Sequence, residues 1–82
     1  MRYKIVKGLE SIREVFDNLK KDPIITSSYS GKTIENVCQG NSGIVYEPKL
    51  KKITIVGDKN NNLIKRFYTL IYENKIKLIK CQ

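Results

Sequence analysis

The chain contains no histidine, no tryptophan and no alanine, and only two of its 82 residues are cysteine. Histidine is the side chain that most often donates or accepts protons near neutral pH, so its absence removes the commonest catalytic acid and base. Zinc usually needs about four nitrogen or sulfur ligands, and Cys38 and Cys81 stand far apart with no CxxC motif. We therefore expect no enzymatic activity, no metal and no cofactor.

Long hydrophobic runs are also absent, because no stretch exceeds three consecutive apolar residues. A membrane-spanning helix needs about 20 apolar residues, and a secretory signal needs an apolar stretch of about 7–15. We therefore expect a cytoplasmic protein that makes no contact with a membrane and keeps both thiols reduced. A chain of this length has room for one hydrophobic core, which predicts a single domain over residues 1–82.

Positive charge is what the chain has in excess, with 16 lysines and arginines against 8 acidic residues and a formal charge of +8. The excess lies in the second part of the chain. Residues 48–82 hold nine basic and two acidic residues, a net +7, whereas residues 1–47 hold seven and six, a net +1. This asymmetry predicts an acidic partner for the C-terminal half.

Hydrophobic patterns predict most of the secondary structure. Leu9, Ile12, Val15, Phe16 and Leu19 form one stripe of a helix, which Pro23 ends. Alternation of apolar and polar residues predicts strands at 2–7, 43–47, 52–56 and 75–80, the middle two joined by a turn at Pro48.

Residues 63–73 carry a conflict between composition and pattern. Phe67, Tyr68 and Tyr72 favour a strand, whereas the apolar residues gather on one side only at helical spacing. The pattern predicts a helix with Tyr68 and Tyr72 at the flank of its apolar side, bordering the core or forming part of an interface. The alternative is a β-meander through residues 52–81.

Residues 23–42 have no clear pattern and are interpreted as an insertion of loop or short helix. Ser27–Gly31 is a loop by composition, and Tyr29 within it is a candidate exposed contact. Residues 32–39 suit either a short helix or a ragged strand.

The resulting order is β-α-β-β-α-β with the insertion at 23–42. This order predicts an α+β, ferredoxin-like two-layer sandwich, a four-stranded antiparallel sheet with two helices on one face. That fold supports many unrelated functions and indicates no activity.

The predicted sheet places cations on the face that the helices leave open, with Lys4 beside Thr54. The candidate partner-binding residues are Arg2, Lys4, Lys52, Thr54, Lys75, Lys77 and, in the loop, Tyr29. Such a face suits a phosphate backbone or an acidic protein. It holds no aromatic ring for base stacking, which disfavours single-stranded nucleic acid.

Two functional hypotheses follow. The first is a non-enzymatic binding module whose basic C-terminal half contacts nucleic acid or an acidic protein surface. The second is a small inhibitor or regulator, encoded by a phage or mobile element, that binds a host nuclease, polymerase or lysis factor. The abundance of lysine, isoleucine and asparagine suggests an AT-rich genome and suits the second. Either would act as a monomer or small homo-oligomer.

Overall fold

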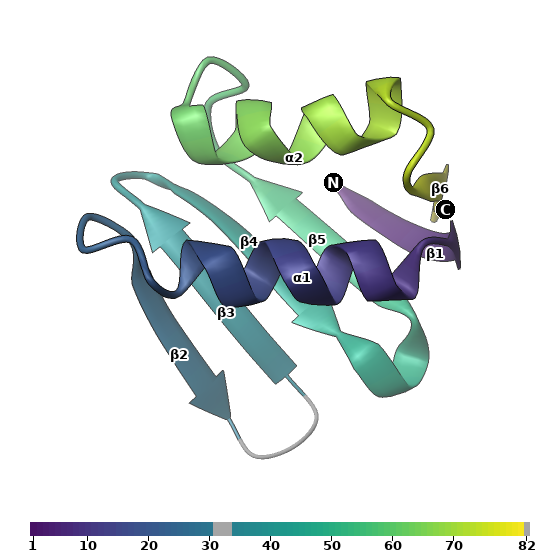
Figure 1. Cartoon of the computed structure of the whole chain (residues 1–82), viewed down its shortest axis with the longest axis horizontal. Helices are drawn as coiled ribbons and strands as arrows, with labels where there is room; N and C mark the ends of the chain where they lie inside the picture. The colour runs from purple at the N-terminus through teal and green to yellow at the C-terminus, as the bar shows by residue number, and fades with distance from the viewer. Residues whose placement is uncertain (31–33, 82) are drawn as a thin grey trace.

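The structure is a computed structural model that describes residues 1–30 and 34–81, with the side chains of 28–30 left out. The elements in chain order are β1 (Arg2–Lys7), α1 (Leu9–Leu19), β2 (Thr26–Ser30), β3 (Ile34–Gln39), β4 (Ser42–Glu47), the 3-10 turn η1 (Pro48–Leu50), β5 (Lys52–Val56), α2 (Asn62–Tyr72) and β6 (Lys77–Lys80). The strands form one sheet in the order β2-β3-β4-β5-β1-β6, and α1 crosses in front of it (Figure 1). Every neighbouring pair of strands is antiparallel.

The prediction of a four-stranded ferredoxin-like sandwich is wrong, because the sheet has six strands. The four expected strands are present and lie side by side as β4-β5-β1-β6. The predicted insertion at 23–42 is neither loop nor short helix over most of its length, because β2 and β3 pair as a hairpin. β3 also pairs with β4, so the hairpin extends the sheet by two strands.

The sequence pattern of this hairpin explains why it was missed. Inward positions of β3 hold Glu35, Val37 and Gln39, and Glu35 is buried. A charged residue at an inward position breaks the alternation by which a half-buried strand is recognised. β2 is rich in serine and lies at the sheet edge, where backbone hydrogen bonds to β3 hold it without a strong apolar signal. Gly31 of the predicted loop lies outside the described residues.

Both predicted helices are confirmed. α1 buries Ile12, Phe16 and Leu19. α2 begins where the Asn61 side chain accepts a hydrogen bond from the Leu63 backbone N–H at 2.8 Å, an N-cap that satisfies one of the free donors of the first turn.

The helices pack against the same face of the sheet. Their buried residues join the inward residues of the strands in one cluster, Ile5, Ile12, Phe16, Leu19, Ile25, Val37, Ile44, Tyr46, Ile53, Ile55, Leu63, Ile64, Phe67 and Ile76. The opposite face of the sheet has no helix over it among the described elements. No helix in residues 1–30 and 34–81 has the length and apolarity needed to cross a membrane.

Candidate binding surface on the uncovered sheet face

The strand register identifies the residues on the uncovered side, which we call the open face. Because side chains alternate between the two faces of a sheet, every second residue belongs to it. Its described members on the four central and C-terminal strands include Gly43, Val45 and Glu47 of β4, Lys52, Thr54 and Val56 of β5, Arg2 and Lys4 of β1, and Lys77 and Ile79 of β6. β3 adds Ile34, Asn36 and Cys38.

Cations gather where β5, β1 and β6 meet. Lys4 lies directly opposite Lys52 on one side and Ile79 on the other, while Arg2 lies opposite Thr54. The prediction placed Lys4 beside Thr54, whereas the structure places it opposite Lys52, two residues away along β5. Like charges that lie directly opposite each other on a sheet repel, so this arrangement costs the folded chain free energy.

Little acidic charge offsets these cations. Within the described part of the chain, Arg2, Lys4, Lys52 and Lys77 take part in none of the ion pairs. Glu47 is the cross-strand neighbour of Lys52, so one of the four cations has a carboxylate nearby. Lys7 and Lys77 form a second pair of opposed lysines just past a β-bulge in β1. The cationic end of the open face is therefore suited to an acidic partner.

Apolar side chains are also exposed on the open face. Val56 is 56% exposed and Ile79 is 53% exposed. Gly43 has no side chain, and a Cβ there would stand 3.3 Å from the Cys38 Sγ. A shallow hollow of about 280 Å³ lies around Gly43, lined in part by Asn36, Cys38, Val45 and Val56. A protruding apolar side chain of a partner would fit such a hollow.

Two predicted site residues lie elsewhere. Lys75 precedes β6, outside the sheet, and its ammonium is 3.0 Å from the Glu73 carboxylate. Tyr29 is a residue of the edge strand β2, at the register position opposite Glu35, and not of a loop. The hollow was not predicted, because residues 32–39 suited either a short helix or a ragged strand; the structure confirms the strand, which carries Asn36 and Cys38. The one sequence feature that pointed to this part of the sheet was the β-rich stretch that follows Gly43.

A buried charge cluster lies on the other side of the sheet, under α1. The Glu35 carboxylate is 1% exposed; its Oε1 accepts a hydrogen bond from the Lys20 ammonium, and its Oε2 is 2.5 Å from the Arg13 guanidinium. Burial by itself raises the pKa of Glu35, but the contacts with Lys20 and Arg13 outweigh it and hold that pKa below its ordinary value. The Glu35 carboxylate is an internal counterion that joins α1 to β3.

Tyr46 packs beside this cluster. Its ring centroid is 5.3 Å from that of Phe16, and burial raises the pKa of its hydroxyl. A tyrosine whose pKa is raised stays neutral at physiological pH, which suits a place in the core.

The chain matches no family model, and no curated protein and no solved structure matches it significantly.

Proposed function

We propose that this chain is a non-enzymatic binding module whose open face docks against an acidic, partly apolar protein surface. The observation that carries the proposal is an uncovered sheet face on which cations without ion-pair partners adjoin exposed aliphatic side chains. Bare sheet faces with apolar groups are typical of interaction surfaces.

The composition of the open face supports a protein partner over a nucleic acid. Nucleic-acid platforms built on sheets stack bases on aromatic rings, and the described open-face positions hold none. Burying exposed valine and isoleucine against apolar protein atoms contributes favourable binding free energy, whereas contact with charged phosphates contributes little.

An inhibitor that covers an acidic site on a host nuclease, polymerase or lysis factor is one form of such a module. In this form, apolar contact at the shallow hollow would supply affinity. The flanking cations would orient the two proteins and raise the association rate.

The proposal is tested by affinity capture from a nuclease-treated cell extract, followed by titration of each captured protein in purified form. Three forms are compared with the wild-type chain. Arg2→Gln/Lys4→Gln removes two open-face charges, Val56→Gln removes an exposed apolar group, and Lys59→Gln/Lys65→Gln removes two charges elsewhere. We expect the first two variants to lower the affinity for a purified partner at least about tenfold. The third variant should bind the partner with unchanged affinity.

Two results would overturn the proposal. One is a purified partner that binds all three variants as tightly as the wild type. The other is a nucleic acid whose affinity depends specifically on Arg2 and Lys4, which would assign the open face to phosphates.

A further inference from the structure

A second concave surface lies along the flank of α2, between the helix and the β5–α2 loop. Lys65, Tyr68, Thr69 and Tyr72 recur at the three- and four-residue spacing that aligns side chains along one side of a helix. Opposite them, Lys59 and Asn60 of the β5–α2 loop form the second wall. Together these six residues line a groove of about 540 Å³, which we call the α2 groove and which is of the size of small-ligand sites.

The loop wall of the α2 groove is held in place by hydrogen bonds. The Asp58 carboxylate accepts from the Asn60 backbone N–H at 2.8 Å, and the Asp58 N–H donates to the Ser42 hydroxyl at 3.1 Å. Gly57 lies at φ +114°, and a Cβ there would come within 2.5 Å of the Ser42 backbone. The close approach of loop and sheet therefore fixes where Lys59 and Asn60 stand.

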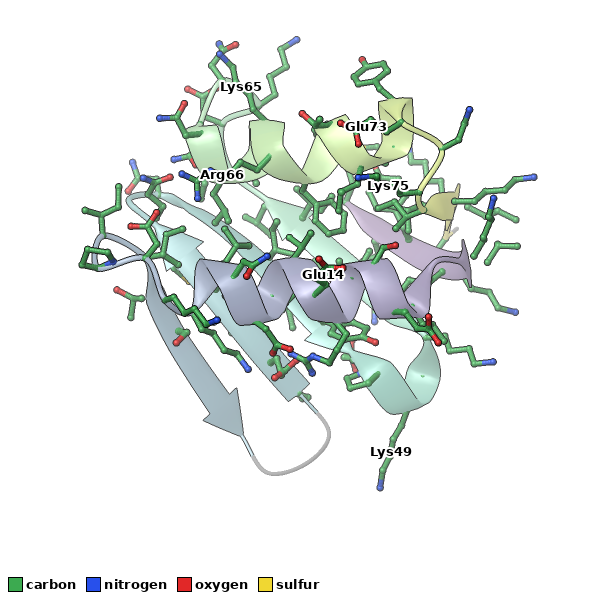
Figure 2. All side chains as sticks on the ribbon, viewed as in Figure 1. Glu14, Lys49, Lys65, Arg66, Glu73 and Lys75 are labelled. Carbon is green, nitrogen blue, oxygen red and sulfur yellow. The ribbon has the colours of Figure 1, made fainter. Side chains whose placement is uncertain are left out.

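Two uncompensated cations mark one end of the groove. Lys59 and Lys65 are exposed, and neither belongs to an ion pair in the part of the chain that the structure describes. Arg66, the next cation on α2, is instead held 3.3 Å from Asp22. Lys65 projects away from the sheet (Figure 2). Asp58, the nearest acid in the sequence, forms an ion pair with neither lysine among the described residues, and its carboxylate accepts the Asn60 backbone N–H.

Aromatic rings line the rest of the groove. Tyr72 is 86% exposed, although an aromatic ring gains more than most side chains from burial. Tyr68 is half-buried against the core and presents its remaining surface to the same groove. Lys65 and Tyr72 are seven residues apart, about 10 Å along a helix at about 1.5 Å per residue.

We propose that the α2 groove binds single-stranded nucleic acid, with phosphates on Lys59 and Lys65 and bases against Tyr68 and Tyr72. Single-strand sites combine a cationic track with rings on which bases stack, and the groove supplies both within the length of one or two nucleotides. This site lies on the helix side of the molecule, so it is separate from the open face. An acidic peptide would use the lysines but has no need of exposed rings.

Fluorescence anisotropy with two labelled strands tests this proposal. One is an oligothymidylate of about ten nucleotides, and the other is an abasic strand with the same phosphates. We expect the wild type to bind the oligothymidylate about tenfold more tightly, since each stacked base adds binding. Tyr72→Ala should reduce that preference, because only Tyr68 is left to stack, while leaving the abasic strand unaffected.

The charge contribution is tested by salt dependence. Lys59→Gln/Lys65→Gln should lower the slope of log K against log salt by about 1.4, at about 0.7 for each phosphate. Lys49→Gln/Lys51→Gln loses the same charge at η1, at the end of the molecule away from α2, and should keep both the slope and the preference for bases. Equal binding of the two strands by the wild type, a Tyr72→Ala variant that keeps the preference undiminished, or an acidic peptide that binds as tightly would each overturn the assignment.

Discussion

At the scale of single residues, Glu35 is the side chain on which the most unusual feature of the fold depends. It is a fully buried carboxylate on β3, and its cationic contacts come from Arg13 of α1 and from Lys20, the residue that follows α1. Burying a charge is costly unless opposite charges accompany it. Lys20 and Arg13 therefore make the inward position of Glu35 possible, and Glu35 in turn fixes α1 over the β2–β3 hairpin.

Replacing this carboxylate should destabilise the chain. Glu35→Gln leaves two cations facing each other, and we expect a loss of about 2–4 kcal/mol in the free energy of unfolding. That is somewhat less than for a fully buried pair, because the Lys20 and Arg13 side chains are 30% and 40% exposed. Urea denaturation measures it. Asp17→Asn, which removes an exposed neighbour of Arg13, is the control and should cost under about 1 kcal/mol. Similar losses in the two variants would contradict this role of Glu35.

The same carboxylate predicts how stability depends on pH. Its folded pKa lies below the ordinary 4.5, so in acid the unfolded chain binds the proton more readily than the folded chain. The stabilisation is present above the unfolded pKa and is lost as the pH falls through the folded pKa. We expect the stability difference between the wild type and Glu35→Gln to shrink as the pH falls through the ordinary value of 4.5 toward the lower folded pKa. Urea titrations across this range that give a constant difference would refute the assignment.

At the scale of elements, α1 is the helix that closes the core over the middle of the sheet (Figure 1). Phe16 is completely buried and touches the Tyr46 ring. Truncating a buried phenylalanine typically costs about 3–5 kcal/mol, through lost burial and the cavity that remains. Phe16→Ala should therefore remove most of the stability available to a chain of this size.

Thermal and urea unfolding of Phe16→Ala measure this loss. Glu14→Ala, on the exposed side of the same helix, should shift stability by less than about 0.5 kcal/mol (Figure 2). If Phe16→Ala lowers the free energy of unfolding by less than about 1 kcal/mol, the Phe16 side of α1 does not form part of the core.

At the scale of the whole molecule, the +8 charge opposes folding as well as attracting a partner. Lys4 lies opposite Lys52, so Lys4→Glu should exchange a repulsion for an attraction and raise stability by about 0.2–1 kcal/mol. Urea unfolding at low and high salt checks this, and the gain should diminish as salt screens the charges.

Lys49→Glu is the matched control for this change. It alters the net charge equally, but Lys49 projects from η1 at the end of the molecule away from α2 (Figure 2). If Lys4→Glu stabilises the chain no more than Lys49→Glu does, the cross-strand repulsion is not significant. If the proposed function holds, Lys4→Glu should also lower the affinity for the acidic partner. The lysine at this position would then favour binding at the expense of folding stability.

Local sequence patterns were enough to predict the helices and strands whose inward residues are all apolar. The stripe from Ile12 to Leu19 predicted α1, and the helical spacing around Phe67 outweighed strand-favouring aromatics in α2. The hairpin of β4 and β5 was likewise predicted and is confirmed. Among the site residues, the placement of Arg2, Lys4, Lys52 and Thr54 on one face followed from alternation, whereas the cross-strand partner of Lys4 did not.

The sequence by itself determined two helices, a central hairpin and a basic C-terminal half, because hydrophobic periodicity and charge are local properties. Only the tertiary structure decided that β2 and β3 extend the sheet to six strands. Glu35 can face inward only when Arg13 and Lys20, 22 and 15 residues earlier, stand over it, and no local pattern records such distant partners. The tertiary structure likewise decided where the hollow at Gly43 and the α2 groove lie, because each joins residues from separate elements.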